Sequence, residues 1–233
     1  MGEESALIQV RGVERTFRQG TVEVRALRGV DLEVEAGEFS VLAGPSGSGK
    51  TTLLNVIGCL DQPTEGSVVI DGVEVSKFGR KEAAEFRLKR IGFVFQAYNL
   101  IPVLTAYENA EFIMLMQGVD AKERRQRVEE LLKEVGLEDE MNRRPHELSG
   151  GQQQRVAVVR AIAAQPVIVL ADEPTANLDS ANSEALLDLL SELNQEHGVT
   201  FLFSSHDPAV IDRCTRVIRL DSGEVVADER KGE

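Results

Sequence analysis

The spacing of hydrophobic and polar positions changes several times along this chain, and each spacing predicts a kind of element. Residues 7–10 and 30–34 alternate apolar and polar side chains, as half-buried strands do. Short, continuous apolar runs bounded by turn residues predict core strands. These runs lie at residues 39–43, 91–95, 167–171, 200–205 and 217–220, and a hairpin turn at Asp71-Gly72 joins strands at 67–70 and 73–75.

Helical spacing appears in four other stretches. It predicts helices over residues 51–60, 121–135, 152–164 and 181–197, with Gly136 and Gly198 ending two of them. Strands alternate with helices at both ends of the chain, which predicts a mostly parallel sheet covered on both faces. We therefore expect a single domain over residues 1–233. Its core comes from about 1–96 and 165–233, and about 97–164 form a helical insertion.

Composition narrows the class of protein. The chain has 233 residues, 42% hydrophobic and 28% charged, which is ordinary for a soluble globular protein. No apolar run approaches the roughly 20 residues that span a bilayer, and the acidic start lacks the features of a secretion signal. The net charge of −13 disfavours nucleic acid as the main partner. Basic strings at residues 87–90 and 124–127 are best interpreted as solvated helix faces, although a local basic patch is the alternative.

The two cysteines lack the spacing of a metal or redox site. Cys59 lies in an apolar helical run and Cys214 near a strand. Both are interpreted as reduced, packed thiols, which fits a cytoplasmic protein.

The clearest chemistry lies in the run Gly44-Pro45-Ser46-Gly47-Ser48-Gly49-Lys50-Thr51, which fits GxxxxGK[ST] between a predicted strand and a predicted helix. Glycines let backbone N–H groups surround a phosphate, and the helix N-terminus adds partial positive charge. Lys50 supplies a full charge, the Thr51 hydroxyl can bind Mg²⁺, and Thr52 completes the loop. A glycine-rich turn with a stray lysine is the competing interpretation, and the strand-loop-helix context disfavours it.

Two carboxylates follow a later apolar strand. Asp172 and Glu173 come directly after residues 167–171, and ligands of parallel sheets bind at the carboxyl ends of the strands. We expect Asp172 to hold Mg²⁺ and Glu173 to orient a water molecule against a terminal phosphate. Two solvated acids at a strand end are the alternative, which the upstream phosphate loop makes less attractive.

A second anion site comes from Leu148-Ser149-Gly150-Gly151-Gln152, glycine-rich at the start of a predicted helix. Ser149 can cap this helix, and the glycine amides can face an anion. Two phosphate-binding segments in one chain suggest that each binds a different nucleotide. Two chains would then have to meet before either site is complete.

The order of these motifs resembles the ATP-binding subunit of ABC transporters. After the phosphate loop come Gln96, the LSGGQ run, Asp172-Glu173, Asn177-Leu178-Asp179 and His206, so the resemblance covers nearly the whole chain. It implies a P-loop NTPase (RecA-like) α/β core with an antiparallel β subdomain and an inserted helical subdomain. It also implies hydrolysis of ATP with Mg²⁺.

The resemblance assigns further roles. Phe17 stands where an aromatic residue stacks on adenine, Gln96 reaches Mg²⁺ and the attacking water, and His206 contacts the γ-phosphate. Ser149, Gly150, Gly151, Gln152 and Asp179 act on the nucleotide of a second copy in a head-to-tail dimer. His146 and His197 have no such role and are interpreted as loop surface and helix-end cation.

Three stretches point to one branch of the family. Residues 55–64, 91–109 and 175–179 resemble the branch that serves lipoprotein release and macrolide-type efflux, although Ala176 stands where many relatives have glycine. The resemblance implies a separate membrane permease and a peripheral position on the cytoplasmic face of the membrane. Tyr98, Leu100, Pro102 and Leu104 are its candidate docking surface, and local core packing is the alternative interpretation.

Other functions share the same ATPase chemistry. An ATPase that drives a membrane partner mechanically, or signals to it, without moving a substrate would contain the same motifs. A chromosome- or repair-type ATPase is disfavoured, because its head carries a long coiled-coil insertion and because this chain is acidic. A GTPase is disfavoured because no guanine-binding NKxD motif is present.

Overall fold

The computed structural model describes residues 6–20 and 22–231, and its centre is a six-stranded sheet. The strand order is β10-β9-β3-β8-β7-β6, in which only β10 runs antiparallel to its neighbour. The mostly parallel α/β core predicted from the sequence is thus confirmed. The strands are β3 (Phe39–Ala43), β6 (Ile91–Phe95), β7 (Ile168–Asp172), β8 (Phe201–Ser205), β9 (Arg216–Asp221) and β10 (Glu224–Arg230).

The parallel strands are in a register that brings their carboxyl ends together. Every residue of β3 and β8 is buried, as expected for strands covered on both faces. Ala43 pairs with Ser205, Ser204 with Asp172, and Asp172 with Phe95. Strands β3, β6 and β8 therefore end one residue before a predicted site residue, namely Gly44, Gln96 and His206. Strand β7 ends at one, Asp172.

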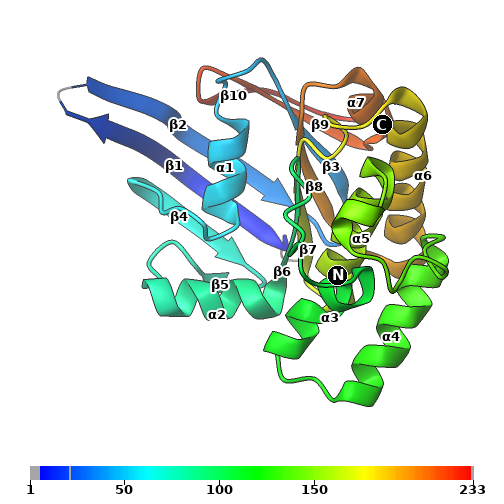
Figure 1. Cartoon of the computed structure of the whole chain (residues 1–233). Helices are drawn as coiled ribbons and strands as arrows, with labels where there is room; N and C mark the ends of the chain where they lie inside the picture. Colours follow the sequence, from blue (N-terminus) through cyan, green and yellow to red (C-terminus); the bar gives the residue numbers. More distant parts are fainter. Residues whose placement is uncertain (1–5, 21, 232–233) are drawn as a thin grey trace, which may run out of the picture.

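A second, antiparallel sheet lies to one side of the core (Figure 1). Its long strands extend well beyond the predicted segments at 7–10 and 30–34, because their outer halves pair through the backbone while their side chains stay exposed. The outer half of β2 also alternates, but its apolar side chains, Val22 and Val24, are exposed. The sheet has the order β2-β1-β4-β5, with β1 (Ile8–Gln19), β2 (Val22–Val34), β4 (Glu65–Ile70) and β5 (Val73–Glu74).

The insertion lies on the other side of the core and is helical, as predicted (Figure 1). Its last helix packs on the two longer helices before it and on strand β6. One buried apolar cluster runs from the insertion into the core. No long coiled coil occurs among residues 6–20 and 22–231. The insertion contains α3 (Ala106–Met116), α4 (Ala121–Glu134), the 3-10 turn η1 (Pro145–Glu147) and α5 (Gly150–Ala163).

Helices of the core cover the sheet. Helix α1 (Lys50–Ile57) follows the phosphate loop, and α6 (Ser180–His197) ends at Gly198, whose φ of 65° is left-handed. Two further helices of the core, α2 (Arg80–Arg90) and α7 (Pro208–Arg213), were not predicted from the pattern, and within the helical insertion α3 had no predicted range of its own. No residue of α2 is buried, so apolar periodicity could not reveal it. None of the described helices has both the length and the apolar character needed to cross a bilayer.

The cysteines are packed thiols, as predicted. Both are buried and unpaired, and burial raises the pKa of Cys59 to about 11 and that of Cys214 to about 12. Helix α1 ends at Ile57, however, so Cys59 lies just beyond the helix rather than inside it. The basic strings are also on helices, where Arg90 pairs with Asp71, Arg124 with Glu111 and Arg125 with Glu129.

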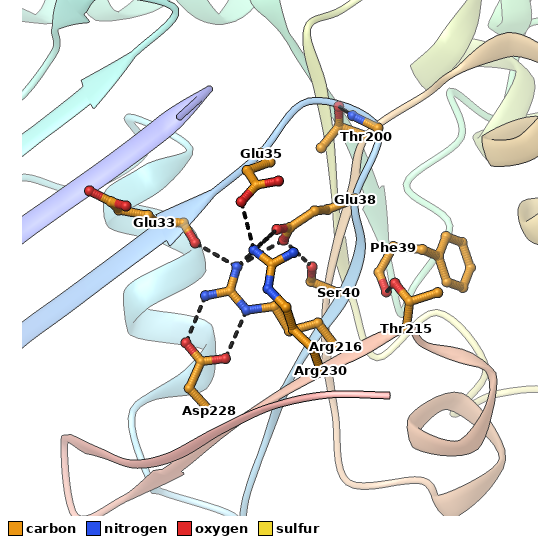
Figure 2. A network of polar contacts seen from close by, with 11 residues as sticks. Glu33, Glu35, Glu38, Phe39, Ser40, Thr200, Thr215, Arg216, Asp228 and Arg230 are labelled. Atoms are coloured by element: carbon orange, nitrogen blue, oxygen red, sulfur yellow. Dashed lines mark hydrogen bonds and ion pairs between the residues drawn. The ribbon is translucent and has the colours of Figure 1, made fainter. Parts of the chain in front are cut away.

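A buried arginine joins the C-terminal hairpin to the core (Figure 2). Arg216 on β9 donates to both carboxylate oxygens of Asp228 on β10, at 2.7 and 2.6 Å. It also donates to the Glu38 carboxylate at 2.9 Å and to the Glu33 carbonyl at 2.7 Å. Arg230 adds a bond of 2.7 Å to Glu38. We refer to Glu38, Arg216, Asp228 and Arg230 as the Arg216 network.

Candidate functional site

A cavity of about 700 Å³ lies at the carboxyl edge of the six-stranded sheet. The phosphate loop forms its floor, and Gln96, Glu173 and His206 reach it from the ends of β6, β7 and β8. Residues of β2, among them Val24 and Arg28, close another side. The parallel register therefore collects side chains that are far apart in the sequence into a single cavity.

Two glycines of the phosphate loop have no room for a side chain. At Gly44, with φ of 153°, an added Cβ would lie 2.1 Å from the Leu220 carbonyl oxygen. At Gly49, with φ of 106°, it would lie 2.6 Å from the Ala26 carbonyl oxygen. Backbone conformation and close packing both demand glycine here. The loop is thus fixed against β9 and β2, with its N–H groups at the start of α1.

Lys50 is the buried cation of this loop. Only 6% of the residue is exposed, and its Nζ donates to the carbonyls of Gly44 at 2.7 Å and Pro45 at 2.9 Å. These bonds hold the ammonium beneath the loop at the cavity wall. The cavity also touches Pro45, Ser46, Gly47, Gly49, Thr51 and Thr52, whereas Ser48 is buried.

Thr51 and Asp172 form an oxygen pair beside the loop. The Thr51 hydroxyl donates to Asp172 Oδ1 at 3.1 Å. A hydroxyl and a carboxylate are oxygen ligands of the kind that Mg²⁺ prefers, and the ion usually keeps several waters as well. The two residues fit a site for this ion. Gln96 is exposed at the same cavity, where its side-chain oxygen could be added.

Glu173 is held from several directions. Its backbone has a left-handed φ of 46°, and its N–H donates to the Ser204 carbonyl at 2.8 Å. Ser205 Oγ donates to one carboxylate oxygen at 3.0 Å, and His206 Nδ1 lies 2.7 Å from the other. A non-glycine residue in this conformation costs about 1–3 kcal/mol and persists only where its surroundings hold it. The strain and the contacts together give the carboxylate a single orientation.

Ser205 is a site residue that sequence reasoning missed. It is fully buried at the end of β8, and the strand pattern alone classes it as a core residue. Its position directly before His206 was the available signal, because both residues reach Glu173 from the same strand end.

The LSGGQ residues lie outside the cavity. Ser149 caps α5, since its Oγ accepts from the Gln152 N–H at 3.2 Å while Gln152 Oε1 accepts from the Ser149 N–H at 2.9 Å. The helix therefore begins at Gly150, which confirms the cap predicted at Ser149, although the apolar spacing predicts a start two residues later. Gly151 faces α6, where an added Cβ would lie 2.6 Å from Asn182 Oδ1.

Asp179 caps the neighbouring helix. Its carboxylate accepts from the N–H and the side chain of Asn182, both at 2.8 Å, and these bonds lower the pKa of Asp179 below its ordinary value. Helices α5 and α6 thus start side by side. None of Ser149, Gly150, Gly151, Gln152 and Asp179 lines the cavity.

Phe17 lies on the β1–β2 hairpin next to the cavity rather than in its lining. The residue is 41% exposed, and its partner across the strands is Val24, which does line the cavity. The Arg15 guanidinium lies 4.4 Å from the centre of the ring and is bound to Asp61 at 2.8 Å. A cation thus covers one face of an otherwise exposed aromatic ring.

The residues after Gln96 form a turn that contacts other loops. Tyr98 and Asn99 have left-handed φ values of 58° and 50°, and Arg160 of α5 donates to the Tyr98 carbonyl at 2.9 Å. The Tyr98 hydroxyl donates to the Asn177 carbonyl at 3.3 Å, and Asn177 Nδ2 donates to the Gln96 carbonyl at 2.8 Å. This turn therefore connects Gln96 with the Asn177–Asp179 loop.

An apolar groove of about 280 Å³ lies beside this turn. Phe93, Phe95, Ile101, Phe112 and Ile113 supply its apolar lining. The four residues predicted to form a docking surface, Tyr98, Leu100, Pro102 and Leu104, do not line it. Leu100 packs against the main apolar cluster, in agreement with the alternative that local packing explains part of this segment.

Sequence comparison places these features among known proteins. Residues 27–176 match the family described as ABC transporter. The chain is 49% identical over 226 residues to an uncharacterized ABC transporter ATP-binding protein of Thermotoga maritima, covering 97% of this chain and 96% of that protein. It is 47% identical over 222 residues to the lipoprotein-releasing system ATP-binding protein LolD of Anaeromyxobacter dehalogenans, covering 95% and 93%.

A solved structure has the same fold. The ATP-binding cassette MJ0796 of Methanocaldococcus jannaschii, a dimer in a post-hydrolysis state bound to ADP and Pi, superposes with a TM-score of 0.87. The two chains are 45% identical, and the match covers 96% of this chain and 98% of that one.

Proposed function

The chain belongs to the ABC transporter family, as one of its ATP-hydrolysing subunits, and on that premise we propose how its residues divide the work. Two copies close head to tail on ATP. Each copy hydrolyses the nucleotide bound at its own phosphate loop, and the cycle drives a separate membrane permease. The permease is of the lipoprotein-release or macrolide-export kind, and the subunit docks on it from the cytoplasmic side.

The observation that carries this proposal is the separation of the two anion-binding features. The phosphate loop, Gln96, Glu173 and His206 line the cavity, and Asp172 is bound to the Thr51 hydroxyl beside it. The capped helix starts at Ser149 and Asp179 lie outside it. One chain therefore has a nucleotide site that is open on one side, and it also presents helix starts that can bind an anion but face no nucleotide of their own. In a head-to-tail dimer, the helix starts of each copy close the open site of the other.

The residues of the cavity have distinct tasks in this proposal. The loop amides and Lys50 hold the β- and γ-phosphates, where Lys50 exchanges its bonds to loop carbonyls for bonds to phosphate oxygens. Thr51, Asp172 and Gln96 hold Mg²⁺, which neutralises phosphate charge when bound. Glu173 orients water against the γ-phosphate, and His206 contacts that phosphate while it fixes the Glu173 carboxylate.

The partner's residues complete the γ-phosphate site. Ser149 and the amides of Gly150, Gly151 and Gln152 face the nucleotide of the other copy at a positive helix end. Asp179 lies beside them and contacts the other copy across the same dimer interface. ATP is then part of the interface, so hydrolysis loosens the dimer and gives a switch between two states.

The proposed permease site is the apolar groove beside the Tyr98–Asn99 turn. A short amphipathic helix places apolar side chains at the spacing that such grooves accept. The groove adjoins the turn that contacts Gln96 and Asn177. A permease helix bound in the groove would therefore contact the turn that leads to Gln96 in the nucleotide site. The similarity to LolD supports a permease partner of this type.

The test of the ATPase assignment is Glu173→Gln. We expect turnover to fall by roughly a hundredfold or more, since the group that orients water is lost, while ATP still closes the dimer. Static light scattering with Mg-ATP should show a stable dimer. Glu192→Gln on the exposed side of α6 is the matched control and should turn over normally. Normal turnover by Glu173→Gln, or only monomer with Mg-ATP, would contradict the proposal.

A further inference from the structure

A buried glutamine connects the LSGGQ helix to the loop that carries Glu173. Gln154 on α5 is fully buried, and its Nε2 donates to the carbonyl of Pro174 at 2.8 Å. Pro174 directly follows Glu173. The other amide atom, Oε1, has no hydrogen-bond partner among the described residues. A buried amide that is only half satisfied costs stability, which calls for an explanation beyond packing.

The bond acts on the strained part of the site. Glu173 is held by Ser204, Ser205 and His206, all from the end of β8. The Gln154 bond holds the next residue from a different element, helix α5. The left-handed backbone conformation of Glu173 is intrinsically unfavourable, so it is maintained only by such contacts. A shift of α5 would therefore displace Pro174.

The exposed end of the same helix is the end that meets the partner's nucleotide in the proposed dimer. Gln154 follows Ser149 by five positions, which is about 7.5 Å along a helix. Gly151 packs directly on Asn182, so the start of α5 lies against the start of α6. A short helix of this kind transmits displacement as a rigid body. Contact at Ser149 is thus mechanically linked to Pro174.

We infer that Gln154 is a positioning residue, which couples engagement of the partner's nucleotide at Ser149 to the placement of Glu173 in the chain's own site. This inference rests on the proposed function, in which Glu173 orients water and Ser149 faces the second nucleotide. It gives the two sites of the dimer a direct connection. One site reaches its productive geometry only when the other nucleotide is in place.

The test is Gln154→Met, which keeps the length of the side chain and removes its donor. We expect kcat for ATP to fall about tenfold or more because Glu173 is misplaced, while KM and the Kd of the single chain for ATP stay within about twofold. With Mg-ATP the variant should accumulate as a dimer on light scattering, as Glu173→Gln does. Gln154→Leu is a second variant with the same expectation.

Neighbouring residues provide the controls. Gln153→Met removes a similar amide that donates to the Leu148 carbonyl, and it should keep kcat near the wild-type value. Ser149→Phe should instead prevent the dimer while ATP still binds to the single chain. Wild-type kcat for both Gln154 variants would overturn the inference. Loss of the dimer, of ATP binding or of the fold in both would overturn it too, by assigning Gln154 to stability alone.

Failure of this inference is distinguishable from failure of the proposed function. If Glu173→Gln hydrolyses ATP normally, the catalytic assignment is wrong and the positioning role falls with it. If Glu173→Gln traps the dimer and Gln154→Met turns over normally, only the positioning role is wrong.

Discussion

Phe17 illustrates how one residue can depend on a neighbour for its task. Its ring is exposed on the hairpin, and the Arg15 guanidinium covers one face. Asp61 holds Arg15 in place, so the ring has little freedom to turn away. In the proposed ATP site the uncovered face would stack on the adenine, as the family resemblance implies. We therefore expect Arg15 to orient the Phe17 ring for this contact.

Replacing Phe17 by Ala should weaken ATP binding to the single chain. Loss of a base–aromatic stack costs about 1–3 kcal/mol, which corresponds to a rise in Kd of roughly fivefold to 150-fold. Isothermal titration calorimetry with Mg-ATP on the Glu173→Gln background gives the Kd without hydrolysis. Val22→Ala removes another exposed apolar side chain of the same hairpin and should leave the Kd unchanged. Equal Kd values for the two variants would remove Phe17 from the site.

Strand β10 shows how an element can be secured by charge rather than by apolar burial. Most of its side chains are exposed, and its sequence has no strong strand pattern. The Arg216 network attaches it to β9 and to the segment before β3. Arg216 and Glu38 both have side chains that are only 8% exposed. The network therefore joins β10 to the starts of β9 and β3, at the edge of the sheet opposite the phosphate loop.

Replacing Arg216 by Met should destabilise the fold strongly. The Glu38 carboxylate would stay buried without its main counter-charge, and breaking a buried pair in this way costs about 3–5 kcal/mol. Urea denaturation followed by circular dichroism measures this change. Arg219→Met on the same strand is the control, because its side chain is about half exposed, and it should change the free energy of unfolding by less than about 1 kcal/mol.

The same network predicts a direction for the pH dependence of stability. Hydrogen bonds from Arg216 lower the pKa of Asp228 below its ordinary value of 3.8. A depressed folded-state pKa stabilises the protein above the unfolded-state pKa, and this stabilisation is lost as the pH falls below 3.8 towards the folded-state value. Asp228→Asn should therefore flatten the acid limb of a melting-temperature profile. An unchanged acid limb would show that Asp228 does not contribute.

At the scale of the whole molecule, helix α5 connects two surfaces, the proposed dimer interface at Ser149 and the apolar groove beside the Tyr98–Asn99 turn. Helix α5 presents Ser149 outward and holds the Tyr98–Asn99 turn through Arg160. That turn adjoins the apolar groove and contacts Asn177, close to Asp179. An event at the groove and an event at the dimer seam therefore act on the same helix. This arrangement suits a subunit that exchanges force between a nucleotide and a membrane partner.

Docking of the permease can be tested on the groove. Phe112→Glu places a charge among apolar side chains, so copurification with the permease expressed alongside the chain should be lost. Leu115→Glu on the same helix is the control, because Leu115 is exposed but does not line the groove. Circular dichroism melting should show that both variants fold. Equal copurification of the two variants would place the docking site elsewhere.

Sequence alone determined much of this protein. The phosphate loop, the strand-end carboxylates, His206 and the capped LSGGQ helix are local features, since a few adjacent residues specify each through backbone freedom, capping or apolar periodicity. The parallel core and the helical insertion were predicted from the same patterns, whereas the antiparallel sheet was implied by the family resemblance. Exposed elements such as α2 and β10 escaped prediction, because they lack the apolar spacing that reveals an element.

Only the tertiary structure decided which residues meet. Strand register brings Ser205 to Glu173, and helix packing brings Gln154 to Pro174, although about twenty or more positions separate the members of each pair in the chain. The apolar groove lies beside the turn of Tyr98 but is lined by other residues, and the Tyr98 hydroxyl bonds to Asn177. Such contacts depend on the relative placement of whole elements. That placement is set by the summed packing of the fold, and no short stretch of residues records it.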